Sequence, residues 1–308
     1  IVVFFSAVNT IFSQQTLPIE TLVQKGHIQP VSRVAYHPSG NYFVTGGMDN
    51  SIILWDVQSG QQIRSFNIHT ERINNLEFSA DGNSILSSSM DNMIYVTDII
   101  SGEIKEKYLH KFKDSYPMSV CFSTLNNYII IGDNRDRIFY INRSQQSTEQ
   151  LTKGFSASVT SLSISPNEMN RLNLVDYQKV QLIKVGVRDS LNLTFDKANN
   201  FSFSPNGKHV AIGSTKLKAS IFEVETGKLI QELIPNPEKQ CDGCNIKIAY
   251  SPNGVYFLTY DTYNGLVVWN TGNWKKLFQL EFNEARFEQF EFSMDNNLIL
   301  LSNSDQCQ

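Results

Sequence analysis

Hydrophobic residues along most of this chain alternate with polar ones in short runs, and turn-forming residues separate the runs. The turns include Ser-Pro-Asn-Gly at 204–207 and 251–254, Pro-Ser-Gly at 38–40 and Ala-Asp-Gly at 80–82. A period of two is typical of β-strands, and glycine in such turns supplies the positive φ of a hairpin. The pattern therefore predicts many short strands joined by hairpins, and it contains no helical period.

The alternating runs belong to a repeat of about 42 residues. Residues 26–61 align with residues 68–103, and His27, for example, returns 42 positions later as His69. Weaker copies follow, with similar runs that begin at Ser119, Ser161, Phe201, Ile248 and Phe290. Each copy is expected to supply several short strands.

These repeats resemble the WD40 family of β-propellers over residues 16–308, most closely in the first two copies. The resemblance implies an all-β propeller in which four-stranded blades are arranged radially around a channel. In that family a His before the first strand, a Ser or Thr in the second, an Asp in the next turn and a Trp in the third strand form a buried hydrogen-bonded tetrad. The matching residues are His27, Thr45, Asp49 and Trp55 in the first copy, and His69, Ser87 and Asp91 in the second, where Thr97 replaces Trp.

Later copies depart from the tetrad pattern. The Asp position becomes Arg135 in the third copy, Lys216 in the fifth and Tyr263 in the sixth, although Trp269 is retained. We expect those blades to be held by sheet pairing and apolar packing alone.

The chain length predicts about seven blades, with the last one truncated. At 42 residues per copy the chain holds fewer than seven full repeats and stops at Gln308, before the outer strands of the seventh. Thr16–Lys25 resembles an outermost strand, placed as in WD40 rings that share one blade between both termini. We therefore expect a propeller over residues 16–308 with an incomplete seventh blade, and a natural protein that continues beyond Gln308, where a further domain could lie.

Residues 1–12 are strongly apolar and suggest the hydrophobic region of a secretory signal, with cleavage near Ser13. On this interpretation residues 1–15 are a signal-peptide remnant, and the mature protein is extracytoplasmic, either periplasmic or secreted. The alternative is a buried first strand, because the segment is rich in β-forming residues.

Composition and charge restrict the class of partner. The 308 residues are 41% hydrophobic and 11% aromatic, which indicates a folded protein rather than a disordered one. The net charge of −4 and the pI near 5.8 disfavour nucleic acid. No apolar run reaches the roughly 18–20 residues of a membrane-spanning helix, so no membrane span is expected.

The sequence carries no motif for catalysis, cofactor binding or metal binding. It lacks the GxSxG elbow of serine hydrolases, the glycine-rich phosphate loops and the HExxH zinc motif. We therefore predict no catalytic residue, no cofactor, no metal site and no enzyme. The alternative is a hydrolase-type or lyase-type propeller with an active site at the channel mouth, where groups such as carboxylates would converge.

Cys241 and Cys244 form a Cys-Asp-Gly-Cys motif between the fifth and sixth copies. Three interpretations remain: a small loop disulfide, two free thiols, or half of a metal site. A structural zinc would need a second pair of ligands, and the other two cysteines, Cys121 and Cys307, are isolated.

Propellers of the WD40 family mostly bind proteins or peptides on the face that carries the loops between blades and the turns between second and third strands. Met, Tyr and Arg, which are enriched at interface cores, recur at the matching positions here. The predicted function is a non-catalytic protein–protein interaction or scaffolding propeller within a larger exported protein. Carried over by position, the contact residues are Pro30, Ser32 and Met48 in the first copy, Arg72, Asn74 and Met90 in the second, and Tyr116, Met118 and Asn134 in the third.

Overall fold

The computed structural model consists of β-strands and the turns between them. It describes residues 2–6, 19–22, 26–112, 114–123, 127–135, 137–150, 158–167, 170–175, 179–184, 193–238, 244–281, 287–293, 296 and 298–303. Within this part of the chain, 28 strands form seven antiparallel four-stranded sheets. The prediction of an all-β propeller with four-stranded blades is confirmed. The chain divides into two compact units, Ile1–Phe155 with Arg286–Gln308 (unit 1) and Ser156–Ala285 (unit 2).

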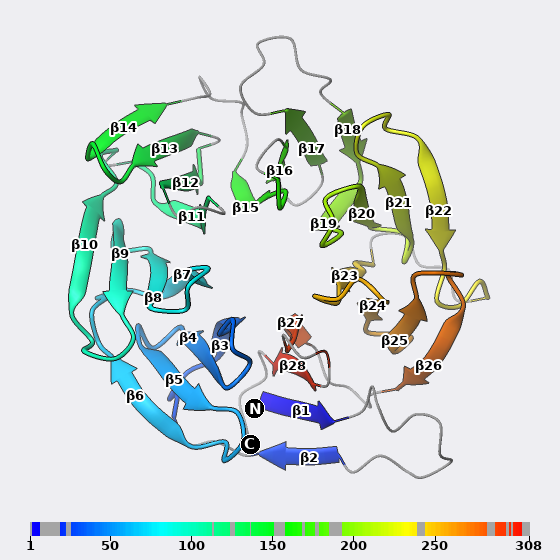
Figure 1. Ribbon diagram of the computed structural model, residues 1–308, viewed down its shortest axis with the longest axis horizontal. Coiled ribbons are helices and arrows are strands. Elements are labelled where there is room, and N and C mark those ends of the chain that lie inside the picture. Colours follow the sequence, from blue (N-terminus) through cyan, green and yellow to red (C-terminus); the bar gives the residue numbers. More distant parts are fainter. Residues whose placement is uncertain are drawn as a thin grey trace. The chain divides into compact units, whose positions relative to one another are not determined.

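Unit 1 contains four of the blades (Figure 1). In three of them the strands are paired in chain order, so each blade is an up-and-down meander. The blade β3–β6 contains β3 (Val31–Tyr36), β4 (Tyr42–Gly47), β5 (Ile52–Asp56) and β6 (Gln62–Phe66). The blade β7–β10 contains β7 (Ile73–Phe78), β8 (Ser84–Ser89), β9 (Met93–Asp98) and β10 (Ile104–Leu109). The blade β11–β14 contains β11 (Pro117–Phe122), β12 (Tyr128–Asp133), β13 (Ile138–Asn142) and β14 (Ser147–Gln150).

The fourth blade of unit 1 is built from both ends of the sequence, and we call it the shared blade. Its strand order is β2-β1-β28-β27. The strands are β1 (Val2–Ser6), β2 (Ile19–Leu22), β27 (Phe287–Phe292) and β28 (Leu298–Asn303). Val3 is paired with Leu301, and Phe4 is paired with Glu20.

The shared blade corrects the predicted truncation. Because β1 and β2 supply the two outer strands, the last blade has four strands, and β28 does not end in an open edge of unpaired N–H and C=O groups. The predicted outermost strand within Thr16–Lys25 is present as β2. Residues 2–6, interpreted as part of a signal remnant, form β1 instead, as the alternative of a first strand expected.

Unit 2 contains three blades with the same meander order. Its first blade is β15 (Val159–Ile164), β16 (Asn170–Val175), β17 (Lys179–Lys184) and β18 (Leu193–Asp196). The second is β19 (Ala198–Phe203), β20 (His209–Ser214), β21 (Ala219–Glu223) and β22 (Leu229–Leu233). The third is β23 (Lys247–Tyr250), β24 (Tyr256–Asp261), β25 (Gly265–Asn270) and β26 (Lys276–Leu280).

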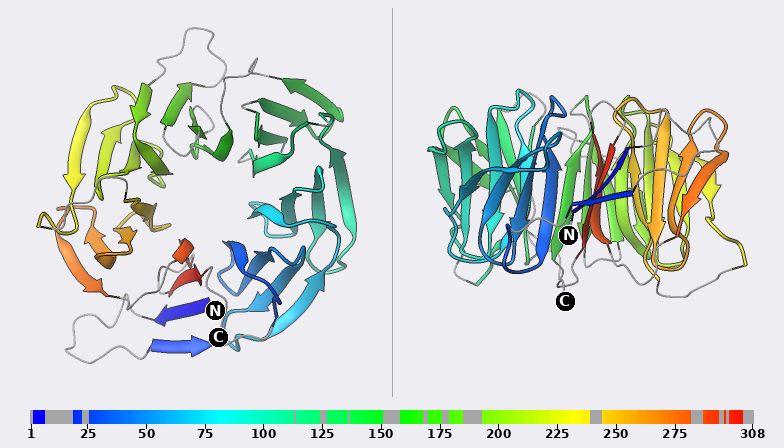
Figure 2. Two further views of the ribbon diagram at one scale, coloured as in Figure 1. Left: turned by 180° about the vertical axis from the view of Figure 1, so that it is seen from behind. Right: turned by 90° about the horizontal axis from the view of Figure 1, so that it is seen from below.

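Apolar faces of neighbouring blades pack against each other within each unit. In unit 1, Val44 and Leu54 of one blade lie in a single cluster with Ile73 and Ile85 of the next. In unit 2, Ile221 shares a cluster with residues of the following blade. Burial of such side chains stabilises a fold by about 25 cal/mol per Å² of apolar surface. Apolar side chains on the strands are therefore buried where the faces of neighbouring blades of a unit meet. In the edge-on view of Figure 2, the strands of a blade run side by side.

The hairpin turns between first and second strands repeat one hydrogen-bonded design. In the Ser-Pro-Asn-Gly turn of blade β19–β22, Gly207 has a φ of +68° and its N–H donates to the Ser204 carbonyl at 2.8 Å. The Ser204 hydroxyl donates to Asn206 Oδ1 at 2.8 Å and accepts from the N–H of His209 at 2.9 Å. Glycine is favoured at the fourth position because most other residues adopt this backbone conformation only with strain.

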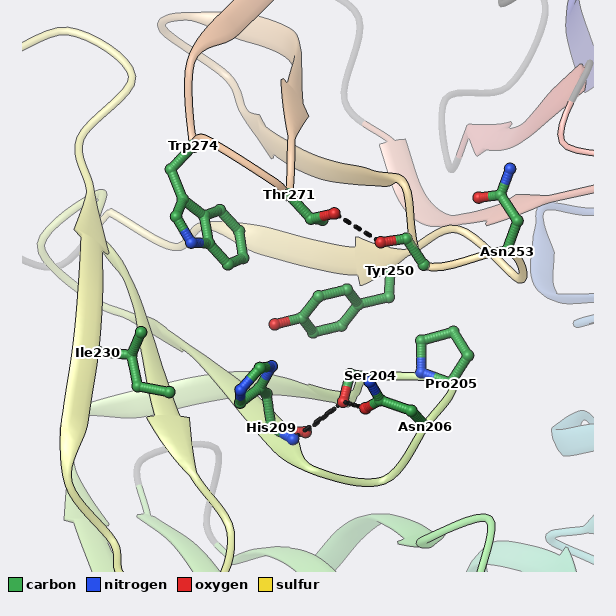
Figure 3. Close-up of a pocket in the computed structure, with 10 residues that line it drawn as sticks. Ser204, Pro205, Asn206, His209, Ile230, Tyr250, Asn253, Thr271 and Trp274 are labelled. Carbon is green, nitrogen blue, oxygen red and sulfur yellow. Dashed lines mark hydrogen bonds between the residues drawn. The ribbon is translucent and has the colours of Figure 1, made fainter.

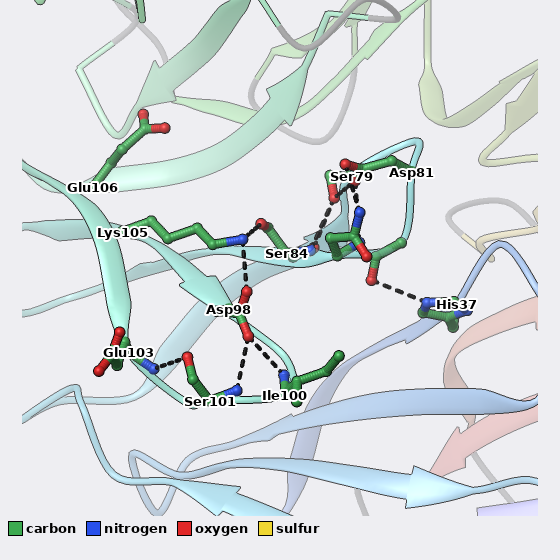
Figure 4. A network of polar contacts seen from close by, with 12 residues as sticks. His37, Ser79, Asp81, Ser84, Asp98, Ile100, Ser101, Glu103, Lys105 and Glu106 are labelled. Atoms are coloured by element: carbon green, nitrogen blue, oxygen red, sulfur yellow. Dashed lines mark hydrogen bonds and ion pairs between the residues drawn. The ribbon is translucent and has the colours of Figure 1, made fainter.

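Polar contacts at this end of unit 1 join two neighbouring blades and also connect strands and turns within the blade β7–β10 (Figure 4). His37 Nε2 lies 3.0 Å from the carbonyl oxygen of Gly82 in the next blade. Lys105 Nζ lies 2.7 Å from Asp98 Oδ2 and 3.2 Å from Ser84 Oγ. Hydrogen bonds from Lys105 and from the N–H of Ser101 hold the pKa of Asp98 well below its ordinary value.

Two glutamates also connect first strands of neighbouring blades. Glu291 Oε2 accepts the N–H of Tyr36 at 3.0 Å, and Glu77 Oε2 accepts the N–H of Phe122 at 3.0 Å. Desolvation raises the pKa of each carboxyl to about 8, although the backbone hydrogen bond acts in the opposite direction. The charge of Glu291 raises the pKa of Glu77 further.

We predict that deleting residues 1–25 destabilises the shared blade, because the deletion removes β1 and β2 and leaves β28 with an open edge. Light scattering after size-exclusion chromatography should show oligomers, and the melting temperature should fall. Deletion of residues 304–308, which follow β28, is the control. A monodisperse deletion variant with the wild-type melting temperature would contradict the pairing.

We also predict that stability falls as the pH rises from about 4.5 to about 8, because the raised pKa makes the folded state hold protons that the unfolded chain has lost. The contribution is fully present below the ordinary glutamate pKa and is lost as the pH reaches the folded value. Glu77→Gln keeps a side-chain oxygen for the Phe122 N–H and should reduce this slope in urea unfolding measured at several pH values. Glu103→Gln, at an exposed position, should leave the slope unchanged.

Candidate partner-binding face

The tetrad of blade β3–β6 is assembled as predicted by position. His27 Nδ1 donates to Asp49 Oδ1 at 2.9 Å, and His27 Nε2 lies 2.7 Å from Thr45 Oγ1. The Trp55 indole N–H donates to the same Thr45 oxygen at 2.7 Å. Desolvation acts to raise the pKa of Asp49, but hydrogen bonds from His27 and Ser51 lower it below its ordinary value. Asp49 is therefore held as a carboxylate, the form that only accepts hydrogen bonds.

The indole of Trp55 needs the glycine that precedes the tetrad histidine. A Cβ atom at Gly26 would lie 2.4 Å from the Trp55 ring, well inside van der Waals contact. Forty-two positions later the second copy has Ile68 in place of Gly26 and Thr97 in place of Trp55. The two replacements are consistent with each other, because a side chain at the first position occupies the space that the indole fills.

Blade β7–β10 retains the rest of the tetrad. His69 Nδ1 lies 2.9 Å from Asp91 Oδ2, and His69 Nε2 lies 2.9 Å from Ser87 Oγ. The Thr97 hydroxyl is buried, and none of the described residues hydrogen-bonds it. This blade therefore keeps an unsatisfied polar group where the first copy has a tryptophan.

In blade β11–β14, Arg135 occupies the position of Asp49 and Asp91, as predicted, because Asn134 before it makes the same backbone hydrogen bond as Met48 and Met90. The buried carboxylate is Asp133, which receives N–H groups of Arg135 and Arg137 at 2.9 and 2.8 Å. Arg137 Nε donates to Asp133 Oδ2 at 2.7 Å, and His110 Nε2 lies 3.3 Å from the same oxygen. Desolvation acts to raise the pKa of Asp133, but hydrogen bonds from His110 and Arg137 lower it to about 2. Asp133 is the last residue of β12, as Gly47 is of β4 and Ser89 of β8, so it lies two residues before the tetrad position and the repeat pattern did not mark it.

Blade β23–β26 of unit 2 keeps half of the tetrad. The Trp269 indole N–H donates to Thr259 Oγ1 at 2.9 Å, as Trp55 does to Thr45. Tyr263, at the predicted Asp position, is 53% exposed. Asp261 fixes the turn instead and accepts the N–H of Asn264 at 2.8 Å. In blade β19–β22, Lys216 forms an isolated bridge with Cys244.

The tetrads of unit 1 stand next to the loops that were predicted to meet a partner. In three successive blades, the turn after the second strand donates an N–H to the loop that enters the first strand. Met48 donates to Pro30 at 3.0 Å, Met90 donates to Arg72 at 3.2 Å, and Asn134 donates to Tyr116 at 3.2 Å, each to the carbonyl oxygen. The structure thus brings these six predicted residues together as three equivalent pairs, which we call the loop pairs.

The side chains of the loop pairs lie at or near the surface of unit 1. Met48 is 40% exposed, and the other five members are partly buried. The Nε atom of Arg72 is buried, and no described residue hydrogen-bonds it. The face therefore combines apolar, aromatic and cationic groups.

The remaining predicted contact residues connect blades. The Ser32 hydroxyl donates to the Ile73 carbonyl at 2.9 Å, and the Asn74 amide donates to the Pro117 carbonyl at 2.8 Å. Asn74 is 4% exposed and Met118 is 9% exposed. Both side chains are thus packed inside unit 1 and unavailable to a partner, which reduces the predicted face to the loop pairs and Ser32.

The cysteine motif is described in part. Cys244 is disulfide-bonded, whereas Cys241, the predicted partner, lies outside the described residues, as does Cys307. Cys121 is buried in β11. The described residues contain no cluster of three or more His, Cys, Asp or Glu side chains able to hold a metal ion. They also contain no helix with the length and apolar character needed to cross a bilayer.

Curated proteins of several functions match the chain. It is 24% identical over 297 residues to protein tipD from Dictyostelium discoideum, covering 79% of this chain and 47% of tipD. It is 38% identical over 45 residues to a subunit of chromatin assembly factor 1 from Mus musculus, covering 15% of this chain and 8% of that protein. It is 40% identical over 47 residues to dynein assembly factor with WD repeat domains 1 from Homo sapiens, covering 15% and 11%. The chain thus spans about half the length of tipD and a small part of the other two.

These relatives overturn the predicted extracytoplasmic localisation. Two of their names refer to chromatin assembly and dynein assembly, and both processes occur inside cells. The apolar segment at the start of the chain, on which the prediction rested, includes the strand β1 of the shared blade. Its hydrophobicity therefore has a structural explanation within unit 1.

We predict opposite effects of one substitution at two different tetrad positions, the third-strand position of blade β7–β10 and the second-strand position of blade β3–β6. Thr97→Val removes a buried hydroxyl without a described partner and should raise the free energy of unfolding by about 1 kcal/mol. Thr45→Val removes the oxygen that joins His27 and Trp55 and should lower it by about 2 kcal/mol. Urea unfolding curves of both variants would test this difference, and equal effects would contradict it.

The family model that matches is that of the WD domain, G-beta repeat, over residues 18–56 and 60–98. These ranges cover the blade β3–β6 and most of the blade β7–β10, where the tetrads are best preserved. Residues 18–98 therefore contain two WD40 repeats, and the four-stranded blades and hydrogen-bonded tetrads formed there are consistent with that match.

Proposed function

We propose that the chain is a non-catalytic interaction module that binds a protein or peptide on the loop-pair face of unit 1. The observation that carries the proposal is the hydrogen-bonded pairing of Pro30 with Met48, of Arg72 with Met90, and of Tyr116 with Asn134 in three successive blades. Each pairing fixes two loops together, so the face is formed before a partner arrives. A preformed surface loses little conformational entropy on binding.

The chemistry of the loop pairs suits a protein partner. Two methionines and one tyrosine supply adaptable apolar area, and such residues are enriched in interface cores. Arg72 adds a buried N–H group that no described residue hydrogen-bonds, and an acceptor of the partner would satisfy it. We propose no catalytic residue and no cofactor for this module.

The similar proteins support an interaction role. Two of their names describe a subunit and an assembly factor of larger complexes. The matched part of tipD is 47% of that protein, so we propose that these blades act within a longer chain. The first step in testing this role is to identify the partner protein.

We expect Met48→Ala together with Tyr116→Ala to weaken partner binding at least tenfold, as loss of central interface side chains does. The measurement begins with photocrosslinking from position 116 in cell extract to identify the partner, followed by titration of the purified partner. Ile100→Ala is the matched control, because Ile100 is 77% exposed and lies in a turn at the opposite end of its blade. If the double variant binds the crosslinked partner as tightly as the wild type and the Ile100→Ala control do, the loop pairs are not the binding face.

A further inference from the structure

Unit 2 contains a pocket of about 460 Å³ between its second and third blades, and no part of the proposed function uses it. The pocket lies at the end of the blades that carries the Ser-Pro-Asn-Gly turns, opposite in each blade to the turns after the second strands. Figure 3 shows Trp274, Tyr250, His209 and Ile230 around the opening, with Pro205 at one side. Its size is typical of pockets that take a small ligand or a few peptide residues.

Trp274 occupies a backbone position that favours glycine. Its φ is +55°, and its N–H donates to the Asn270 carbonyl at 2.7 Å. The same hydrogen bond in other blades is made by Gly60, Gly102 and Gly227, which also have positive φ. A bulky residue in this conformation is strained, and such strain is characteristic of functional sites. An aromatic side chain at this turn therefore calls for an explanation other than turn formation.

The core holds the two aromatic walls of the pocket in place. Phe257, which is fully buried, contacts Tyr250 edge-on at 4.8 Å between ring centroids and Trp274 edge-on at 5.9 Å. Tyr250 and Trp274 both pack against the apolar cluster of these blades while remaining partly exposed. The two rings are consequently fixed in orientation before any ligand binds.

The pocket offers hydrogen-bond donors that the described residues do not use. The Tyr250 hydroxyl is buried, and no described residue hydrogen-bonds it. Burial raises the pKa of Tyr250, so the hydroxyl stays protonated and is able to donate. The Trp274 indole N–H has no described partner and is a donor only. Among the lining residues, His209 is the single ionisable side chain besides Tyr250, and no Lys, Arg, Asp or Glu is present.

We propose that this pocket binds an extended, proline-rich peptide segment. Proline rings are apolar and flat enough to pack between Trp274, Tyr250 and Pro205. A polyproline II backbone has no internal hydrogen bonds, so its carbonyl oxygens are free to accept from the Tyr250 and Trp274 donors. The absence of charged lining residues among those described fits a neutral ligand and disfavours a phosphorylated or strongly charged peptide.

The test is titration of the full chain with an acetylated and amidated decaproline peptide, followed by tryptophan fluorescence. Of the three tryptophans, Trp55 and Trp269 are buried, so a saturable change reports on Trp274. Trp274→Gly restores the residue type of the equivalent turns, so the variant should fold with an unchanged or higher melting temperature. Its binding, followed by calorimetry, should be lost. Tyr250→Phe keeps the ring and removes the donor, and should weaken binding about five- to tenfold.

Gln146→Gly is the matched control, because Gln146 has a φ of +53° at the equivalent turn position of blade β11–β14 in unit 1. This variant should bind decaproline as the wild type does. A decapeptide of alternating lysine and glutamate serves as the second probe and should not bind. Absence of saturable decaproline binding, equal binding of the charged peptide, or wild-type binding by Trp274→Gly would each overturn the proposal.

Discussion

Burial of the apolar faces of neighbouring sheets against each other is the interaction on which each unit depends. A single sheet of four short strands has too small an interior to be stable in water. Val44 and Leu54 are buried because Ile73 and Ile85 of the next blade cover them, and unit 2 repeats the arrangement. Each blade thus needs its neighbours, and the sequence must keep apolar residues on the faces where blades of a unit meet.

This dependence on packing explains why the polar tetrads vary so widely between blades. Blade β3–β6 has all four residues, blade β7–β10 has lost the tryptophan, and blade β11–β14 replaces part of the network with Arg137. The sheets form in every case. The tetrads instead fix the turn after the second strand to the loop that enters the blade, so their main effect is on the shape of one face.

The parts of the fold that depend on local chemistry could be predicted from the sequence. The hairpins follow from turns such as Ser204–Gly207, where a serine hydroxyl and a glycine meet definite backbone requirements. The first two tetrads follow from the 42-residue spacing. The role of Asp133 was missed because it ends β12, at the position that Gly47 and Ser89 hold in the first two copies, rather than at the tetrad Asp position.

Features that depend on contacts between distant segments could not be predicted in the same way. The strand at Val2–Ser6 is apolar in sequence, and only its partners Leu298–Ser302 distinguish a blade strand from a signal segment. Likewise, the burial of Asn74 and Met118 depends on the neighbouring blade rather than on their own position in the repeat. The aromatic pocket also escaped notice, because its walls come from different turns of two blades, although Trp274 at a glycine position was a visible signal.

The shared blade has a consequence for how the chain folds during synthesis. β28 is made nearly 280 residues after β2, so the two halves of the sheet cannot meet until β28 has been synthesised. At about 5–20 residues per second, this delay is on the order of tens of seconds. Throughout that interval the apolar strand β1 lacks its partner β28 and is a substrate for chaperones or for pairing with another nascent chain. Contacts of such long sequence separation also form slowly, so completion of the shared blade is expected to be the last and slowest step of folding.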